Sequence, residues 1–198
     1  MNLATAIRKL TLSMVCTVAL TSGMANATIL HFATALSGPA ESPSNASPGT
    51  GFAEVFIDLT SNTMEVIVNF AGLVGNTTAS HIHCCTAIAG TGTAGVATQT
   101  PTFSGFPLGV TSGSYDHTFN MLLASTWNAP FLAANGGTGA GAEAGLLAGL
   151  AAGKAYLNVH STVFGGGEIR GFLAEVPAPA TLALLGLGLV GLGISRRK

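Results

Sequence analysis

The sequence predicts a mainly β protein: an antiparallel β-sandwich with Greek-key-like connections and a helical excursion before its last hairpin. Three observations lead to this class. Short runs of alternating or β-branched residues recur through the centre of the chain, as in half-buried strands. Gly, Pro, Asn and Ser residues separate these runs and favour turns between them. Only the segment between Leu122 and Lys154 departs from this pattern.

The strands before that segment follow from side-chain alternation. They are expected at 28–36, 51–59, 63–70, 80–85 and 112–121. Ser61 and Asn62 provide a tight turn between the second and third strands. The third strand is expected to bury one face, because its apolar residues occupy every second position. These residues are Met64, Val66, Val68 and Phe70.

The helical excursion is expected in two parts. Residues 122–135 have helical character, and Thr138 is a suitable N-cap for a second helix that runs to Gly153. Glycines recur every four residues in this second helix, at 141, 145, 149 and 153. Each glycine lowers helix propensity, so we expect the stripe to allow a close approach between helix and sheet. A hairpin of strands 155–162 and 168–174 then closes the domain.

Charge separates the centre of the chain from its ends. The 198-residue chain has a formal net charge of −1, with seven Lys and Arg and eight Asp and Glu. Segment 28–175, the size of one domain, holds all the acids but only Lys154 and Arg170 as cations. Two scattered cations make no basic surface, so a nucleic-acid partner is excluded.

The N-terminal segment, residues 1–27, predicts a secretory signal peptide. Arg8 and Lys9 supply its basic region, and an apolar run follows that is too short to be a stable membrane anchor. Ala25 and Ala27 then provide the small-x-small cleavage pattern. The mature protein is therefore expected to begin near Thr28.

The C-terminal segment, residues 176–198, predicts a sorting tail. Pro177 and Pro179 break the chain, and an apolar stretch at about 180–195 is expected to form a single transmembrane helix. The chain ends in three cations, Arg196, Arg197 and Lys198. Terminal cations favour the cytoplasmic side, which places the globular domain outside.

Together these tail features resemble the PEP-CTERM sorting signal, with Ala178 where that family usually has Glu. The resemblance implies recognition and cleavage by an exosortase-type enzyme in a bacterial envelope. It also implies an exported protein, located in the cell envelope or outside the cell and transiently anchored in the inner membrane by the C-terminal helix. A simple C-terminal membrane anchor is the alternative.

The central segment carries three further motifs. They are Ala71-Gly72-Leu73 with Ala79-Ser80-His81-Ile82-His83, then Ala152-Gly153-Lys154-Ala155-Tyr156-Leu157-Asn158-Val159-His160, and Gly167-Glu168-Ile169-Arg170-Gly171. In this order they resemble the CHRD domain over about 30–174. The resemblance implies an extracytoplasmic β-domain of unassigned biochemical role. Cys84 and Cys85 depart from it, because many members have glycines there.

Three histidines are candidates for a metal site. His81 and His83 are two residues apart and point to the same side of a strand. His160 lies on the closing hairpin, so the three can form a cluster that suits copper or zinc. Neighbours expected to support it are Asn158, Glu168 and Arg170. The alternative is a polar network without metal, in which the histidines bond to backbone groups and to Glu168 and Arg170 pairs with a carboxylate.

Cys84 and Cys85 are the only cysteines that remain after export. In an oxidising compartment they can form a vicinal disulfide, an intermolecular bond, or metal thiolates beside His83. We expect the vicinal disulfide.

The spacing of Ser, His and acidic residues selects no catalytic triad, so we do not predict an enzyme. The first hypothesis for function is a non-enzymatic binding or structural module in the envelope or extracellular matrix, with exopolysaccharide or surface proteins as partners. The second is a copper- or zinc-binding protein, of redox type, that uses the His-x-His motif.

Overall fold

The computed structural model describes residues 29–177. The predicted signal peptide and its cleavage site lie outside the described residues, as do Pro179, the apolar stretch at 180–195 and the terminal cations. Within 29–177, no helix is long and apolar enough to cross a membrane.

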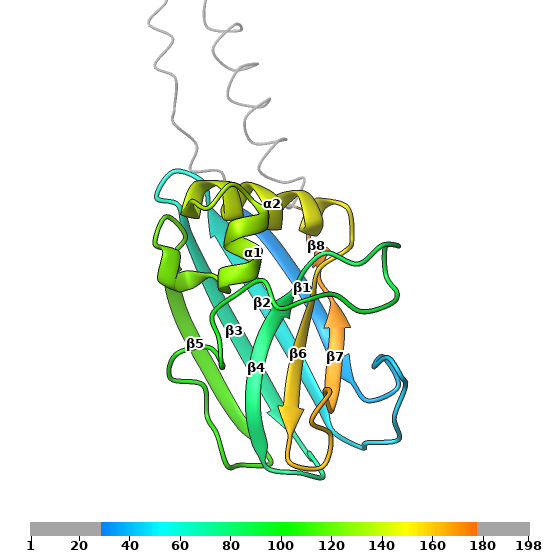
Figure 1. Ribbon diagram of the computed structural model, residues 1–198. Coiled ribbons are helices and arrows are strands. Elements are labelled where there is room, and N and C mark those ends of the chain that lie inside the picture. Colours follow the sequence, from blue (N-terminus) through cyan, green and yellow to red (C-terminus); the bar gives the residue numbers. More distant parts are fainter. Residues whose placement is uncertain (1–28, 178–198) are drawn as a thin grey trace, which may run out of the picture.

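Eight strands carry the fold, and three short helical segments lie between the fifth and sixth strands (Figure 1). The strands are β1 (Ile29–Ser37), β2 (Thr50–Asp58), β3 (Thr63–Ala71), β4 (Thr77–His83), β5 (Gly113–Asn120), β6 (Tyr156–Ser161), β7 (Ile169–Phe172) and β8 (Ala174–Glu175). The helical segments are the 3₁₀ helix η3 (Ala124–Thr126), α1 (Ala129–Ala134) and α2 (Gly139–Ala151). The predicted mainly β class, with a helical excursion before the last hairpin, is confirmed.

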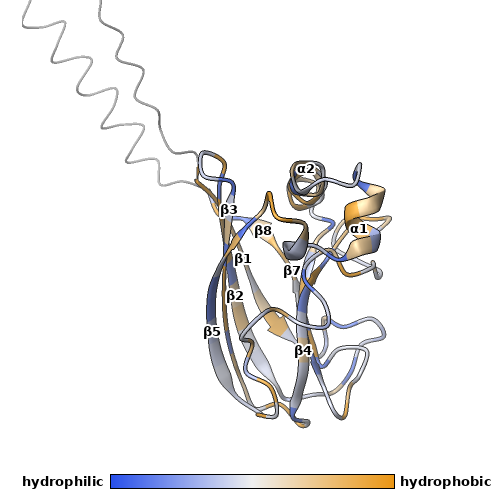
Figure 2. Ribbon diagram, turned by 60° about the vertical axis from the view of Figure 1, so that its left-hand side comes forward, coloured by the Kyte–Doolittle hydropathy of each residue, from blue (hydrophilic) through white to orange (hydrophobic). Residues whose placement is uncertain are grey.

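All eight strands belong to one antiparallel sheet, with the order β4-β6-β7-β1-β2-β3-β5 and with β8 paired to β1. The sheet curls, so that β5, β3 and β2 form one layer and β4 lies in the layer opposite (Figure 2). The chain changes layer between β3 and β4, between β4 and β5, and between β5 and β6. The two layers of the expected sandwich are therefore halves of one continuous sheet.

Strands β1, β2 and β3 form a meander in which β2 pairs with both neighbours along its whole length. The expected turn between β2 and β3 is present, and Asn62 adopts a positive φ of 54° there. Side chains alternate across β3 as predicted, and its apolar face is buried in the core. The residues on that face are Met64, Val66, Val68 and Phe70.

The two halves of the sheet meet where β7 and β8 run beside β1. The pairs Ser37–Arg170, Ala33–Ala174 and Phe32–Glu175 share one register. Gly171 lies in this seam, and a Cβ on it would collide with the carbonyl oxygen of Ala35 and the side chain of Thr34. Only a residue without a side chain fits this approach of the two strands.

The outer edge of β4 is covered by the loop that follows it. Ala97 and Thr98 donate backbone hydrogen bonds to the Ile82 carbonyl, and Phe103 donates to the Ser80 carbonyl. These bonds satisfy an edge that would otherwise present unpaired backbone groups. The loop is thereby fixed beside the outward-facing side chains of β4.

The helices α1 and α2 lie across one end of the curled sheet (Figure 1). Thr138 caps α2 as predicted, because its Oγ1 accepts a hydrogen bond from the Gly141 N–H at 3.1 Å. The expectation for the glycine stripe needs correction. Gly145 faces the side chain of Asn135, and Gly149 faces the sulfur atoms of Cys84 and Cys85. The stripe therefore admits a loop and a cysteine pair close to the helix, whereas α2 packs toward the core through Ala142, Leu146 and Leu150.

Candidate functional site

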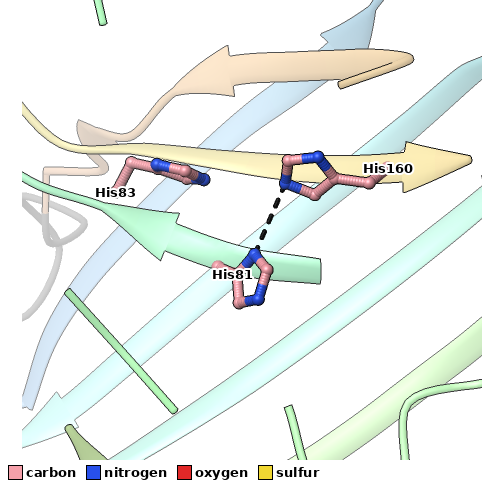
Figure 3. A group of neighbouring side chains, drawn as sticks. All are labelled: His81, His83 and His160. Atoms are coloured by element: carbon pink, nitrogen blue, oxygen red, sulfur yellow. Dashed lines mark hydrogen bonds between the residues drawn. The ribbon is translucent and has the colours of Figure 1, made fainter. Parts of the chain in front are cut away.

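The site lies on the outward face of β4 and β6. His81 and His83 point to this face because Ile82, between them, points into the core with an exposed fraction of 0%. On β6, His160 has the same orientation, with Leu157 and Val159 buried on the other side. Figure 3 shows the three rings turned toward one another from the two strands.

The three imidazoles converge closely. One ring nitrogen from each lies within 4.8 Å of the other two. The shortest separation joins His81 Nδ1 and His160 Nε2, at 3.4 Å. Nitrogen ligands around a tetrahedral zinc ion, with bonds of 2.0–2.1 Å, lie about 3.3 Å apart. A small movement of His83 would therefore complete a three-nitrogen site.

A backbone carbonyl holds the outer nitrogen of each ring. His81 Nε2 donates to Pro101 at 2.6 Å, His83 Nδ1 donates to Ala94 at 2.9 Å, and His160 Nδ1 donates to Gly165 at 3.0 Å. A carbonyl oxygen can only accept, so each of these nitrogens carries the ring proton. Two of the carbonyls lie in the loop between β4 and β5, and the third lies in the loop between β6 and β7. Together they fix both the tautomer and the orientation of every ring.

The inner nitrogens are consequently unprotonated when the rings are neutral. His81 Nδ1, His83 Nε2 and His160 Nε2 then present three lone pairs to one point. The contact between His81 and His160 can be a hydrogen bond only if one of these rings gains a second proton. The inner Nε2 of His83 is buried and has no hydrogen-bond partner in the described part of the chain.

Burial keeps the rings neutral. It lowers the pKa of His83 to about 4, although the hydrogen bond to Ala94 works in the opposite direction. Burial likewise lowers the pKa of His81 and of His160, while their bonds to Pro101 and Gly165 oppose the shift. At neutral pH the cluster therefore offers lone pairs rather than positive charges.

An aromatic stack supports His83. The ring of Tyr156 lies parallel to His83, with centroids 4.8 Å apart and an interplanar angle of 4°. The Arg170 guanidinium carbon lies 4.7 Å from the Tyr156 centroid. Arg170 also donates to the carbonyl oxygens of Ala40 and Gly92, so the stack cannot turn freely.

The carboxylate beside Arg170 is Glu41, whose Oε2 lies 3.7 Å from Arg170 Nε. Both side chains are buried, with 4% of each exposed. Burial raises the pKa of Glu41 to about 7, although Arg170 and a hydrogen bond from the Ser42 backbone oppose the shift. Near neutral pH this buried carboxyl is therefore divided between its neutral and ionised forms.

Glu41 should make folding stability depend on pH. The folded state binds its proton more tightly than the unfolded state does, so stability is fully present below pH 4.5 and is lost as pH rises through about 7. As pH rises from 5 to 8, the free energy of unfolding of the parent should fall by about 1–2 kcal/mol relative to that of Glu41→Gln. Urea denaturation across this range measures the difference. Glu175→Gln, at an exposed position on β8, should track the parent, and identical slopes for all three proteins would contradict the prediction.

Glu168 lies apart from the three rings. Its Oε1 accepts a hydrogen bond from Ser47 Oγ at 2.6 Å and another from the Val74 N–H, and its Oε2 accepts from the Gly75 N–H at 3.2 Å. Burial opposes ionisation of this carboxyl, but hydrogen bonds from Ser161, Ser47 and the two N–H groups lower its pKa. None of its hydrogen bonds involves a histidine; they tie the start of β7 to two loops.

Asn158 lies opposite His81 across the β4–β6 pair and is buried. Its Oδ1 has no hydrogen-bond partner within residues 29–177, and neither has Oε1 of Glu41. Both atoms lie 2.6 Å from the point where Gly167 would carry a Cβ, so the glycine leaves room for the two side chains.

Cys84 and Cys85 directly follow β4, and their sulfur atoms are joined in a disulfide bond. The sulfurs face Gly149 of α2. In the described part of the chain, the group of side chains that could hold an ion contains His81, His83 and His160 but no cysteine. The disulfide is therefore part of the contact between β4 and α2, and the nitrogen cluster is separate from it.

The remaining histidines of the described chain lie elsewhere. His31, on β1, contacts Glu54 Oε1 at 3.1 Å and stacks on Phe56. His117, on β5, is exposed and packs beside Phe119. Neither belongs to the converging group. Both therefore serve as controls for substitutions at the site.

Sequence reasoning did not find Glu41 as the partner of Arg170, and it did not find the three loop carbonyls. A glutamate in a loop carries no periodic signal, and every residue has a carbonyl. The one available signal was charge, because a buried Arg170 requires a partner among the acids of the domain.

Two family models match this chain. The family model of the CHRD domain matches residues 32–173, which includes all three histidines, and that of the PEP-CTERM protein-sorting motif matches residues 175–198. No curated protein and no solved structure is significantly similar to the chain.

Proposed function

The chain belongs to the CHRD domain family, and we propose that its domain binds one copper or zinc ion through His81, His83 and His160. The observation that carries the proposal is the convergence of three lone pairs from rings whose other nitrogens are all held by carbonyls. An imidazole set of this kind suits copper and zinc.

A polar network without metal accounts less well for the same geometry. Such a network pairs donors with acceptors, whereas three inner nitrogens here meet without a proton to share. The buried Nε2 of His83 gains no compensation for its lost hydration unless another group binds it. A metal ion satisfies all three nitrogens at once.

The sorting motif supports a location outside the cytoplasm for the proposed activity. The PEP-CTERM motif implies processing by an exosortase and an exported, cell-envelope protein. We propose that the protein is transiently anchored in the inner membrane by its C-terminal helix and then acts in the envelope or matrix as a metal-binding module. An exported protein is also exposed to environmental copper and zinc.

Metal analysis of the exported protein tests the proposal. We expect the parent to bind one equivalent of copper or zinc and His81→Ala/His83→Ala/His160→Ala to lose at least 100-fold in affinity, because no ligand remains. The measurements are elemental analysis and competitive titration with a chromophoric chelator. His31→Ala/His117→Ala removes two histidines outside the site and should bind like the parent.

The result has a clear contrary outcome. If the parent, correctly folded by circular dichroism, binds neither metal at micromolar concentration, the histidines are structural. Equal binding by the parent and the triple variant would place the metal elsewhere.

A second candidate function concerns a pocket that Gly167 helps to line. Its volume is about 270 Å³, and the residues that line it include Glu41, Ser42, Ser44 and Phe164. A buried carboxyl with an unpartnered oxygen, serine hydroxyls and an aromatic ring together suit a neutral sugar unit of an exopolysaccharide. Arg170 beside Glu41 disfavours a cationic ligand.

Binding at this pocket should depend on Phe164. We expect Phe164→Ala to weaken binding of a neutral exopolysaccharide fragment about tenfold, because the sugar loses its apolar contact. Isothermal titration measures the affinity, with Phe52→Ala, an exposed ring on β2, as control. No heat of binding with the parent, or an equal loss in both variants, would contradict this function.

A further inference from the structure

The charges around the histidines point to a monovalent ion: we propose that the site binds copper as Cu(I) in preference to Cu(II) and Zn(II). This inference rests on the metal-binding function proposed above, and it concerns which ion the same three nitrogens select. Four features of the site favour this ion: the charge of the ligands, the groups behind the ligands, the charge of Arg170 and the number of ligands.

The ligands themselves carry no negative charge. Within residues 29–177, the group that could hold an ion consists of three histidines and includes no Asp, Glu or Cys. Transfer of an ion from water into a partly buried site costs more for a dication than for a monocation, because the hydration energy grows with the charge. Neutral ligands offer the same three lone pairs to either ion. They therefore offset the lost hydration energy of a dication less completely than that of a monocation.

The groups behind the ligands are also neutral. Metal-binding histidines donate their second N–H to a carboxylate, a backbone carbonyl or water, and of these only a carboxylate adds a negative charge near the ion. Here the three partners are the backbone carbonyls of Ala94, Pro101 and Gly165. The carboxylate of Glu168 does not accept from any of these rings, because it accepts hydrogen bonds from Ser47 and from the N–H groups of Val74 and Gly75.

A positive charge lies behind the ring that stacks on His83. Arg170 reaches His83 through the ring of Tyr156, in a stack with spacings of 4.7 Å and 4.8 Å. Its partner Glu41 lies 3.7 Å from Nε and contacts no histidine, so it compensates Arg170 incompletely at the metal. Across the two spacings of this stack, the charge of Arg170 favours binding of a monocation over a dication on the order of tenfold.

The number of ligands fits the same ion. Three imidazoles on two paired strands approach one point from the face of the sheet, and residues 29–177 add no His, Cys, Asp or Glu to this group as a fourth ligand. Zn(II) would require water or another molecule to complete four-coordination. A d¹⁰ monocation with neutral nitrogen donors is complete with three.

Voltammetry of the copper-loaded exported protein tests this proposal. If Cu(I) is bound more tightly than Cu(II), the Cu(II)/Cu(I) couple of the bound ion lies above that of aqueous copper; a couple below it overturns the proposal. Competition with bathocuproine disulfonate for Cu(I) and with a chromophoric chelator for Zn(II) should give at least 100-fold tighter binding of Cu(I). Tighter Zn(II) binding also overturns the selectivity and leaves the metal site intact. Failure to bind any metal overturns the proposed function itself.

Two variants examine the role of Arg170. We expect Arg170→Gln to lower the preference for Cu(I) over Cu(II) about tenfold, whereas Arg170→Lys, which keeps the charge, should retain the preference of the parent. An equal loss of preference in both variants would mean that packing around Arg170, and not its charge, affects the choice of ion. Because Arg170 is buried and a variant can fail to fold, the sign of the couple in the parent decides the proposal by itself.

Discussion

Glu168→Gln is expected to lower the free energy of unfolding by about 3 kcal/mol at pH 7. The carboxylate is wholly buried and accepts hydrogen bonds from the side chains of Ser47 and Ser161 and from two backbone N–H groups. Glutamine has nearly the same shape, but its NH₂ group must face a donor, so at least one strong bond is lost and two donors oppose each other. Urea denaturation monitored by circular dichroism measures the loss.

The pH dependence of this loss distinguishes charge from shape. Hydrogen bonds lower the pKa of Glu168 in the folded state, so its stabilising effect is present above the unfolded pKa of 4.5 and is lost as pH falls through the folded value. The difference between parent and variant should therefore shrink in acid. A loss below 0.5 kcal/mol at pH 7, or one that does not change with pH, would contradict the assigned role.

Gly171→Ala is expected to destabilise the protein by about 3 kcal/mol or more. Its new Cβ would collide with the Ala35 carbonyl and the side chain of Thr34, and a backbone atom cannot move aside as a flexible side chain can. The added methyl must push β7 away from β1, where the two halves of the sheet join. Thermal and urea denaturation of the variant should both show the loss.

The matched control is Gly95→Ala. Gly95 is exposed in the loop after β4, and nothing lies within 4 Å of a Cβ built on it. This variant should stay within about 0.5 kcal/mol of the parent. If both alanine variants lose the same stability, the collision between β7 and β1 is not the cause of the loss, which contradicts the prediction.

The elements that sequence predicts well here are those whose signal is local. Alternation of Met64, Val66 and Val68 defines β3, and Thr138 marks the start of α2. The spacing of His81 and His83 also determines their common face, because side chains repeat every two residues on any strand. These features require no knowledge of which strands become neighbours.

The position of His160 depends on long-range pairing. His160 pairs with Ala79, and Asn158 with His81, across a connection that contains β5 and all the helices. A shift of one residue in this register would turn His160 into the core. The sequence allowed the cluster, but only the β4–β6 register brings the third ring to it. Glu41, in a loop with no periodicity, meets Arg170 only because the fold brings the two side chains together.

The seam between β1 and the β7–β8 segment also bears on export. The first strand of the domain pairs with its last strands, so a chain that crosses a membrane as an unfolded polypeptide, N-terminus first, cannot complete its sheet until residue 175 has emerged. Until then β1 has an open edge that invites association with other chains, and contacts between the two ends of a chain form slowly. The sorting motif begins at residue 175, where the last strand ends. Completion of the sheet thus requires the chain up to the residue at which the sorting motif begins, and a prematurely terminated chain would lack both the closed sheet and the motif.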